Sequence, residues 1–85
     1  MRYHFAMSKI EKQLEKMRRN PLDWRIEDLK AIADRVGLSY RQPGSSHVTF
    51  RSPSGLKLTV PAHKPIKPVY VKKFVELMEE LEDEE

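Results

Sequence analysis

One stretch, residues 44–51 with the sequence GSSHVTFR, constrains the fold more than any other part of the chain. From His47 onward polar and apolar residues alternate, and a period of two is typical of a half-buried strand. His47, Thr49 and Arg51 fall on one face, and Val48 and Phe50 fall on the other. We therefore predict a turn at residues 44–46 that opens into a strand over residues 47–51. Its histidine and arginine lie on the face that the core does not use.

Two more strands are predicted beside it. Residues 38–42 form a first strand, and residues 56–60 a third, which follows the Ser-Pro-Ser-Gly turn at residues 52–55. Phe50 must pair with Leu56 or Leu58, because a slip of one residue would turn the apolar side chains toward solvent. The result is an antiparallel meander with one open polar face, which carries His47, Thr49, Arg51, Lys57 and Thr59.

Helical periodicity marks three further segments. Residues 26–36 carry an apolar stripe and end at Gly37, and residues 69–81 carry a second stripe. A third, narrower stripe over residues 8–19 follows the capping-box pair Ser8 and Glu11. The predicted fold is an α+β two-layer sandwich in which the helices flanking the strands cover one face of the sheet. The three stripes consist of Ile26, Leu29, Ile32, Ala33 and Val36; of Val71, Phe74, Val75, Met78 and Leu81; and of Ile10, Leu14 and Met17.

The predicted elements divide the chain into three parts. Residues 1–25 hold an accessory helix and a linker, residues 26–81 hold the main domain, and residues 82–85 form an acidic tail. The accessory helix is expected to pack on the domain or on a partner. Trp24, the single tryptophan, is interpreted as an anchor that buries the linker, with a stacking platform for bases as the alternative.

Composition excludes several classes of protein. The chain of 85 residues has no cysteine, so it has no disulfide framework, zinc knuckle or thiol nucleophile. Its apolar runs are too short to cross a membrane, and we expect a soluble cytoplasmic protein. The net charge of +3 hides an asymmetry, because all 16 Lys and Arg precede residue 74 and 7 of the 13 acids follow it. The basic part favours a polyanionic partner, most simply nucleic acid, or else an acidic protein.

The order of elements and two short motifs resemble a known family. The motifs are Gly44-Ser45-Ser46-His47, which opens a strand, and Val60-Pro61-Ala62-His63, which leads into a Lys/Pro-rich loop and the last helix. Over residues 26–81 the chain resembles the HicA toxins of toxin–antitoxin systems. The resemblance implies a fold like the double-stranded-RNA-binding domain, α-β-β-β-α. It also implies metal-independent cleavage of mRNA that depends on His47, arrest of translation, and neutralisation by a HicB-like antitoxin. The helix over residues 8–19 and the acidic tail depart from that family.

The residue types on the open face suit RNA cleavage without a metal. The 2′-hydroxyl of RNA can attack the neighbouring phosphate if one group removes its proton and another protonates the leaving oxygen. Histidine is suited to both transfers, which favours His47 as the general base or acid. His63 is a candidate for the second transfer or for a phosphate contact. Arg51, Lys57 and Lys64 are candidates for binding phosphate. Gly44, Ser45 and Ser46 are turn residues whose backbone and hydroxyls can hold a phosphate near His47.

Other interpretations of the same residues remain open. The spacing of the three histidines matches no common ligand pattern, so neither a metal nor a cofactor is expected. A non-catalytic RNA-binding module of the same fold would use the same basic face. A protein-interaction adaptor would instead place that face against an acidic partner.

Overall fold

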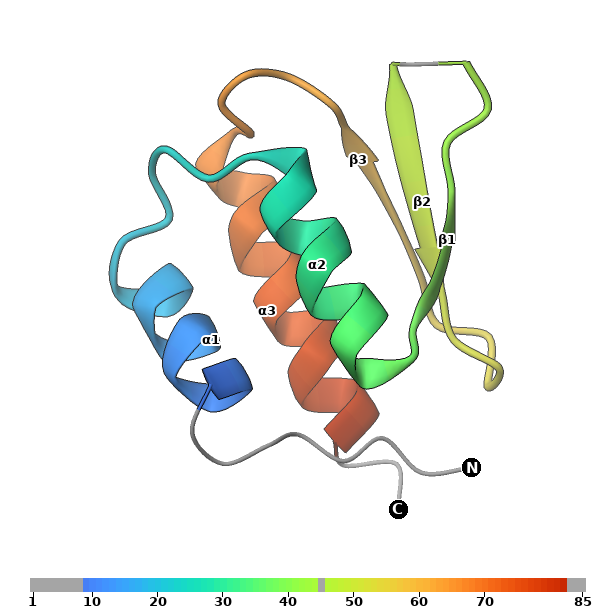
Figure 1. Cartoon of the computed structure of the whole chain (residues 1–85), viewed down its shortest axis with the longest axis horizontal. Helices are drawn as coiled ribbons and strands as arrows, with labels where there is room; N and C mark the ends of the chain where they lie inside the picture. Colours follow the sequence, from blue (N-terminus) through green and yellow to red (C-terminus); the bar gives the residue numbers. More distant parts are fainter. Residues whose placement is uncertain (1–8, 45, 83–85) are drawn as a thin grey trace.

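The computed structural model describes residues 9–44 and 46–82, and within them three helices and three strands form an α+β fold. The strands make one antiparallel sheet in the order β1-β2-β3, which confirms the predicted meander. Helices α2 and α3 lie against one side of this sheet, and α1 lies beyond α3, on its side away from the sheet (Figure 1). The elements are α1 (Lys9–Arg19), α2 (Ile26–Val36), β1 (Ser39–Arg41), β2 (His47–Arg51), β3 (Lys57–Pro61) and α3 (Pro68–Glu82).

The register of the sheet shows which residue of β3 pairs with Phe50, a choice that the alternation of polar and apolar residues left open between Leu56 and Leu58. Phe50 lies opposite Tyr40 on β1 and opposite Leu58, not Leu56, on β3. Leu56 lies in the turn instead: its carbonyl accepts the backbone N–H of Ser52 at 2.9 Å, and its own N–H donates to the Ser52 hydroxyl at 3.0 Å. The third strand therefore begins one residue later than predicted and ends at Pro61, where a missing N–H costs no ladder bond.

The core lies between the sheet and the two helices that cover it. The ring of Phe50 has no exposed surface, and its centroid is 5.1 Å from that of Phe74 on α3 and 5.6 Å from that of Tyr40. The predicted stripe of α3 is buried throughout, and Leu77 is buried as well. A helix covered by the sheet on one side and by α1 on another buries a wider arc than one surface requires. Val36, predicted to be in the core, is only half-buried.

Helix α1 packs on the domain itself. Ile10, Leu14 and Met17, the predicted stripe, are all buried in the same apolar cluster as the sheet and α3. On the solvent-exposed side of α1, the Arg18 guanidinium pairs with the carboxylates of Glu15 and Glu79. The pair with Glu79 connects α1 to α3. The capping residue predicted for this helix, Ser8, lies outside the described residues.

The linker between α1 and α2 is anchored at Trp24. The indole N–H donates to the Asn20 carbonyl at 2.7 Å, and the Trp24 carbonyl accepts the N–H of Ile66 at 2.8 Å. Ile66, in the loop before α3, is buried. Trp24 itself is half-buried against the core, so the anchoring role predicted for it is confirmed.

Helix α2 ends at Gly37, as predicted. This residue adopts the left-handed conformation with φ of 81°, which a helix C-terminus favours and glycine adopts without strain. Within residues 9–44 and 46–82, no helix is long and apolar enough to cross a membrane.

Candidate functional site

The face of the sheet turned away from the helices is polar, and its rows follow from the register. Residues directly opposite one another share a face, so Ser39, Arg51 and Lys57 form one row across the three strands. Arg41, Thr49 and Thr59 form the next row, in which the two threonine hydroxyls lie 3.0 Å apart. His47 and Pro61 form the last row, at the end of the sheet.

His47 is exposed at the first position of β2. Its Nδ1 atom lies 3.1 Å from the Ser46 hydroxyl oxygen, so Ser46 contacts the ring. If Nδ1 carries the proton and donates to Ser46, the Nε2 atom keeps a free lone pair and is a base; the other tautomer makes Nε2 a donor. Gly44, at the preceding turn, has a φ of 74°, a conformation that favours glycine. Ser45 lies outside the described residues.

His63 and Lys64 leave the sheet at the same end as His47. Pro61 lies opposite His47, and the N–H of the next residue, Ala62, donates to the Ser46 carbonyl at 2.8 Å. His63 follows directly, and both it and Lys64 are exposed. The pairing of β2 with β3 therefore brings the two predicted histidines to one edge of the open face, although they are far apart along the hairpin.

Arg51 and Lys57 lie at the opposite end of the open face. His47 and Arg51 lie four positions apart on β2, a separation of about 13 Å at roughly 3.3 Å per residue. The two cations therefore lie too far along the sheet to form a single compact site with His47. They line a hollow of about 350 Å³, together with Ser39, Tyr40, Arg41, Pro43 and Thr49.

Arg41 is the residue that the sequence analysis missed. It is exposed on β1, and its row lies between the row of His47 and the row of Arg51. Arg41 thus lies between Arg51 and Lys57 on one side and the histidine end of the sheet on the other. The alternation of the first strand could have predicted this position, because a strand with Leu38 and Tyr40 facing the core places Arg41 on the open side.

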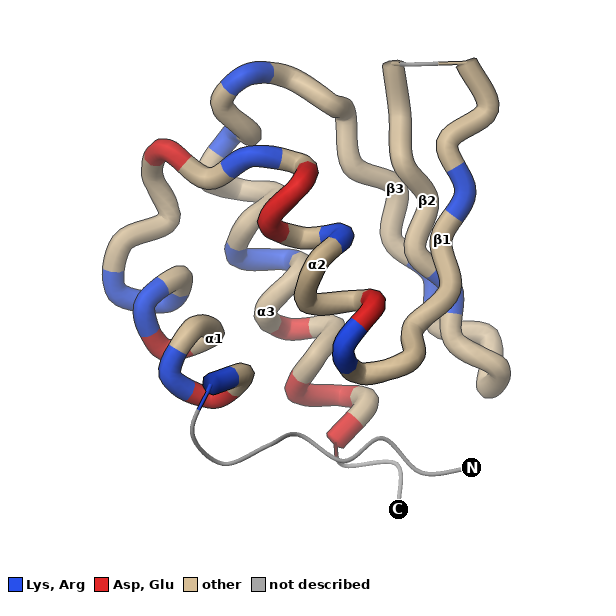
Figure 2. The backbone as a smooth tube through the Cα atoms, in the orientation of Figure 1, with Lys and Arg blue, Asp and Glu red and all other residues tan. Residues whose placement is uncertain are grey.

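Within residues 9–44 and 46–82, no carboxylate forms an ion pair with a cation of this face. Between Asp34 and Glu76 the sequence contains no acidic residue, and Figure 2 shows basic but no acidic positions on the strands. The ion pairs that join described residues lie on α1 and α3. A face of unpaired cations attracts polyanions, because the potentials of the individual charges add. Among residues 9–44 and 46–82, no three His, Asp or Glu side chains are grouped so as to hold a metal ion.

Comparisons with protein families, with curated proteins and with solved structures find no match for this chain.

Proposed function

We propose that the chain is a HicA-like toxin, an endoribonuclease that cleaves mRNA without a metal and so arrests translation in the cytoplasm. The order α2-β1-β2-β3-α3 agrees with the α-β-β-β-α arrangement of the double-stranded-RNA-binding domain, and α1 is an addition to it. A HicB-like antitoxin would neutralise the activity by covering the cationic face.

The observation that carries this proposal is the position of His47. It is exposed at the start of β2, on the face opposite the buried Val48 and Phe50, and none of the residues of the three strands is acidic. A histidine placed to support the fold would be buried or paired with a carboxylate. His47 is exposed and pairs with no carboxylate of the described residues, and its contact with Ser46 holds one ring nitrogen while the other remains available for proton transfer.

The reaction needs two proton transfers and stabilisation of the phosphoryl oxygens. In this proposal His47 accepts the proton of the 2′-hydroxyl as that oxygen attacks the phosphorus. His63 donates a proton to the departing 5′-oxygen, which leaves a cyclic phosphate. Arg41 is the sheet cation nearest to the histidine end and stabilises the developing charge. Lys64, next to His63, binds an adjacent phosphate.

A second candidate function is a non-catalytic RNA-binding module. The hollow lined by Arg41, Arg51 and Lys57 favours it, because most of that cationic surface lies away from His47. RNA held there by its phosphates would remain intact.

Purified protein incubated with RNA in the presence of a chelator separates the two candidates. The unmodified chain should cleave RNA, and His47→Ala should lower the rate by at least about a hundred-fold, the usual contribution of a general base. Because His47 is exposed, the variant should fold as the unmodified chain does. Equal cleavage by both proteins would exclude His47 as the catalytic group. Intact RNA in a stable complex with either protein would favour the binding module.

A further inference from the structure

A second cationic surface lies away from the sheet, between α1 and α2. It is a groove of about 800 Å³, and none of its lining residues belongs to the sheet. Lys9, Lys12 and Lys16 of α1 are among its lining residues, and Arg35 of α2 lies opposite Lys9. The groove, which we call the α1–α2 groove, is lined chiefly by Lys9, Gln13, Lys16, Trp24, Ala31 and Arg35.

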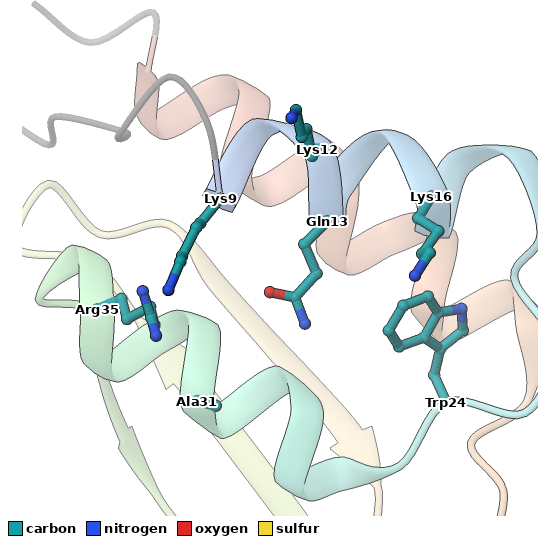
Figure 3. A pocket seen from close by; sticks show the side chains of 7 residues that line it. All are labelled: Lys9, Lys12, Gln13, Lys16, Trp24, Ala31 and Arg35. Carbon is teal, nitrogen blue, oxygen red and sulfur yellow. The ribbon is translucent and has the colours of Figure 1, made fainter.

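The side chains converge on the groove from both helices (Figure 3). Lys9 and Arg35 point toward one another at one end, Lys16 points toward the Trp24 ring at the other, and Gln13 extends into the space between. Lys12 points away. Among the described residues none of these cations is paired with an acid, in contrast to Arg18 and Arg19 on the same helix. Like charges that face each other repel, and an anion bound between them would replace that repulsion by attraction.

The end of the groove at Trp24 offers an aromatic ring in addition to the cations. Trp24 is held by its indole N–H bond to the Asn20 carbonyl and by its carbonyl bond to Ile66, so the ring is fixed before any ligand arrives. An aromatic ring beside a line of cations is the combination with which proteins bind single-stranded nucleic acid, since every base can stack on it. Gln13 adds an amide that both donates and accepts hydrogen bonds, as the edges of bases require.

We propose that the α1–α2 groove is a second RNA-binding site, which holds a single-stranded segment of the substrate. A base stacks on Trp24, and Lys9, Lys16 and Arg35 contact the flanking phosphates. An acidic polypeptide would also be attracted by the lysines, but its carboxylates gain nothing from the Trp24 ring and need no donor–acceptor amide. The choice of RNA as ligand rests on the proposed function. The site itself uses none of the residues of the sheet face.

Trp24 makes the site directly observable, because it is the only tryptophan of the chain. The full chain carrying His47→Ala, which leaves RNA intact, is titrated with an oligouridylate of about ten nucleotides, a length within the usual site size. Stacking of uracil should quench the Trp24 fluorescence. In the same background, Lys9→Gln with Lys16→Gln should weaken binding roughly ten-fold. It should also reduce the slope of log affinity against log salt by about 1.4, the value for two lost phosphate contacts on a single strand.

Two controls make the titration specific. Lys72→Gln with Lys73→Gln removes the same charge from exposed positions of α3, outside the groove, and should change the affinity much less. Trp24→Phe keeps a smaller ring; with a labelled oligonucleotide and anisotropy as the readout, it should bind more weakly than the Trp24 chain and more tightly than Trp24→Leu. Circular dichroism verifies that each variant is folded, and Lys9→Gln with Arg35→Gln replaces the Lys9 and Lys16 double variant if that variant does not fold.

Each outcome has a defined meaning. Absence of quenching, or equal weakening by the two double lysine variants, would overturn the site. Quenching by polyglutamate in place of the oligouridylate would assign the groove to an acidic polypeptide and overturn RNA as its ligand. Cleavage of RNA by the unmodified chain, measured separately, tests the proposed function. Quenching without cleavage would refute the nuclease and retain the groove, whereas cleavage without quenching would refute the groove alone.

Discussion

His47 lies directly opposite Pro61 in the pairing of β2 with β3, at the end of the sheet where the chain leaves β3 toward His63. The backbone bond from the Ala62 N–H to the Ser46 carbonyl holds the two chain segments together just beyond this pair. The two histidines therefore share one edge of the open face for a structural reason, the register of the hairpin. This arrangement allows their roles in RNA cleavage to be tested separately.

His63→Ala should lower kcat by about a hundred-fold if this histidine protonates the leaving 5′-oxygen. A substrate with a nitrophenyl leaving group needs no such proton, so it should be cleaved at nearly the same rate by the variant and by the unmodified chain. His47→Ala should be slow on both substrates, because the attacking hydroxyl is the same. A rise in KM with kcat unchanged would instead identify His63 as a phosphate contact.

Arg51→Gln with Lys57→Gln should raise KM for long RNA and leave kcat within a few-fold. The reason is distance, since both cations lie about 13 Å along the strand from His47, too far to contact the reacting phosphate. A dinucleotide substrate, which cannot extend to the hollow, should be cleaved equally by both proteins. A large fall in kcat on the dinucleotide would contradict this division of the face. Lys72→Gln with Lys73→Gln, two exposed changes on α3, controls for the loss of two positive charges.

Phe50→Ala should destabilise the fold by about 3–5 kcal/mol, the usual cost of removing a fully buried ring. Its side chain is buried completely and contacts the rings of Tyr40 and Phe74, so it joins the sheet to α3. Val69→Ala is the matched control, because Val69 is 50% exposed and its loss should change the free energy of unfolding by less than about 0.5 kcal/mol. Urea denaturation of both variants measures the difference. Similar midpoints would contradict the described core.

Glu15→Gln should change how stability depends on acid pH. The hydrogen bond from the Arg19 side chain, together with the charges of Arg18 and Arg19, lowers the pKa of Glu15 below its ordinary value of 4.5. The unfolded chain therefore takes up the proton first, and the stabilisation is present above pH 4.5 and is lost as the pH falls through the lowered pKa. Because the carboxylate is exposed, the effect should be small.

Denaturation midpoints of the Glu15→Gln variant and of the unmodified chain, taken from pH 7 to pH 3, measure this effect. The unmodified chain should be the more stable at pH 7, and the gap should narrow as the solution is acidified. A gap that stays constant would show that the ion pairs of Glu15 contribute nothing to stability.

Local patterns sufficed for the presence of the three strands and for the bounds and faces of β2, whereas β1 (Ser39–Arg41) is shorter than predicted and β3 (Lys57–Pro61) is shifted by one residue. The alternation over residues 47–51 placed Val48 and Phe50 in the core and His47 and Arg51 outside it, and the structure has the same strand. The stripe of α3 and the stop at Gly37 were equally readable. These features depend on residues within a few positions of one another, since periodicity and turn preference act over a short range.

The sequence by itself determined that a polar, acid-free face with a histidine would exist on a three-stranded sheet. Only the tertiary structure decided how that face is arranged: the pairing of Phe50 with Leu58, the separation of His47 from Arg51, and the place of Arg41 between them. It also decided that α1 packs on α3 and so forms a groove with Trp24 at one end. The physical reason is that these relations join segments distant along the chain, and they follow from how the core packs, not from the preference of any single segment.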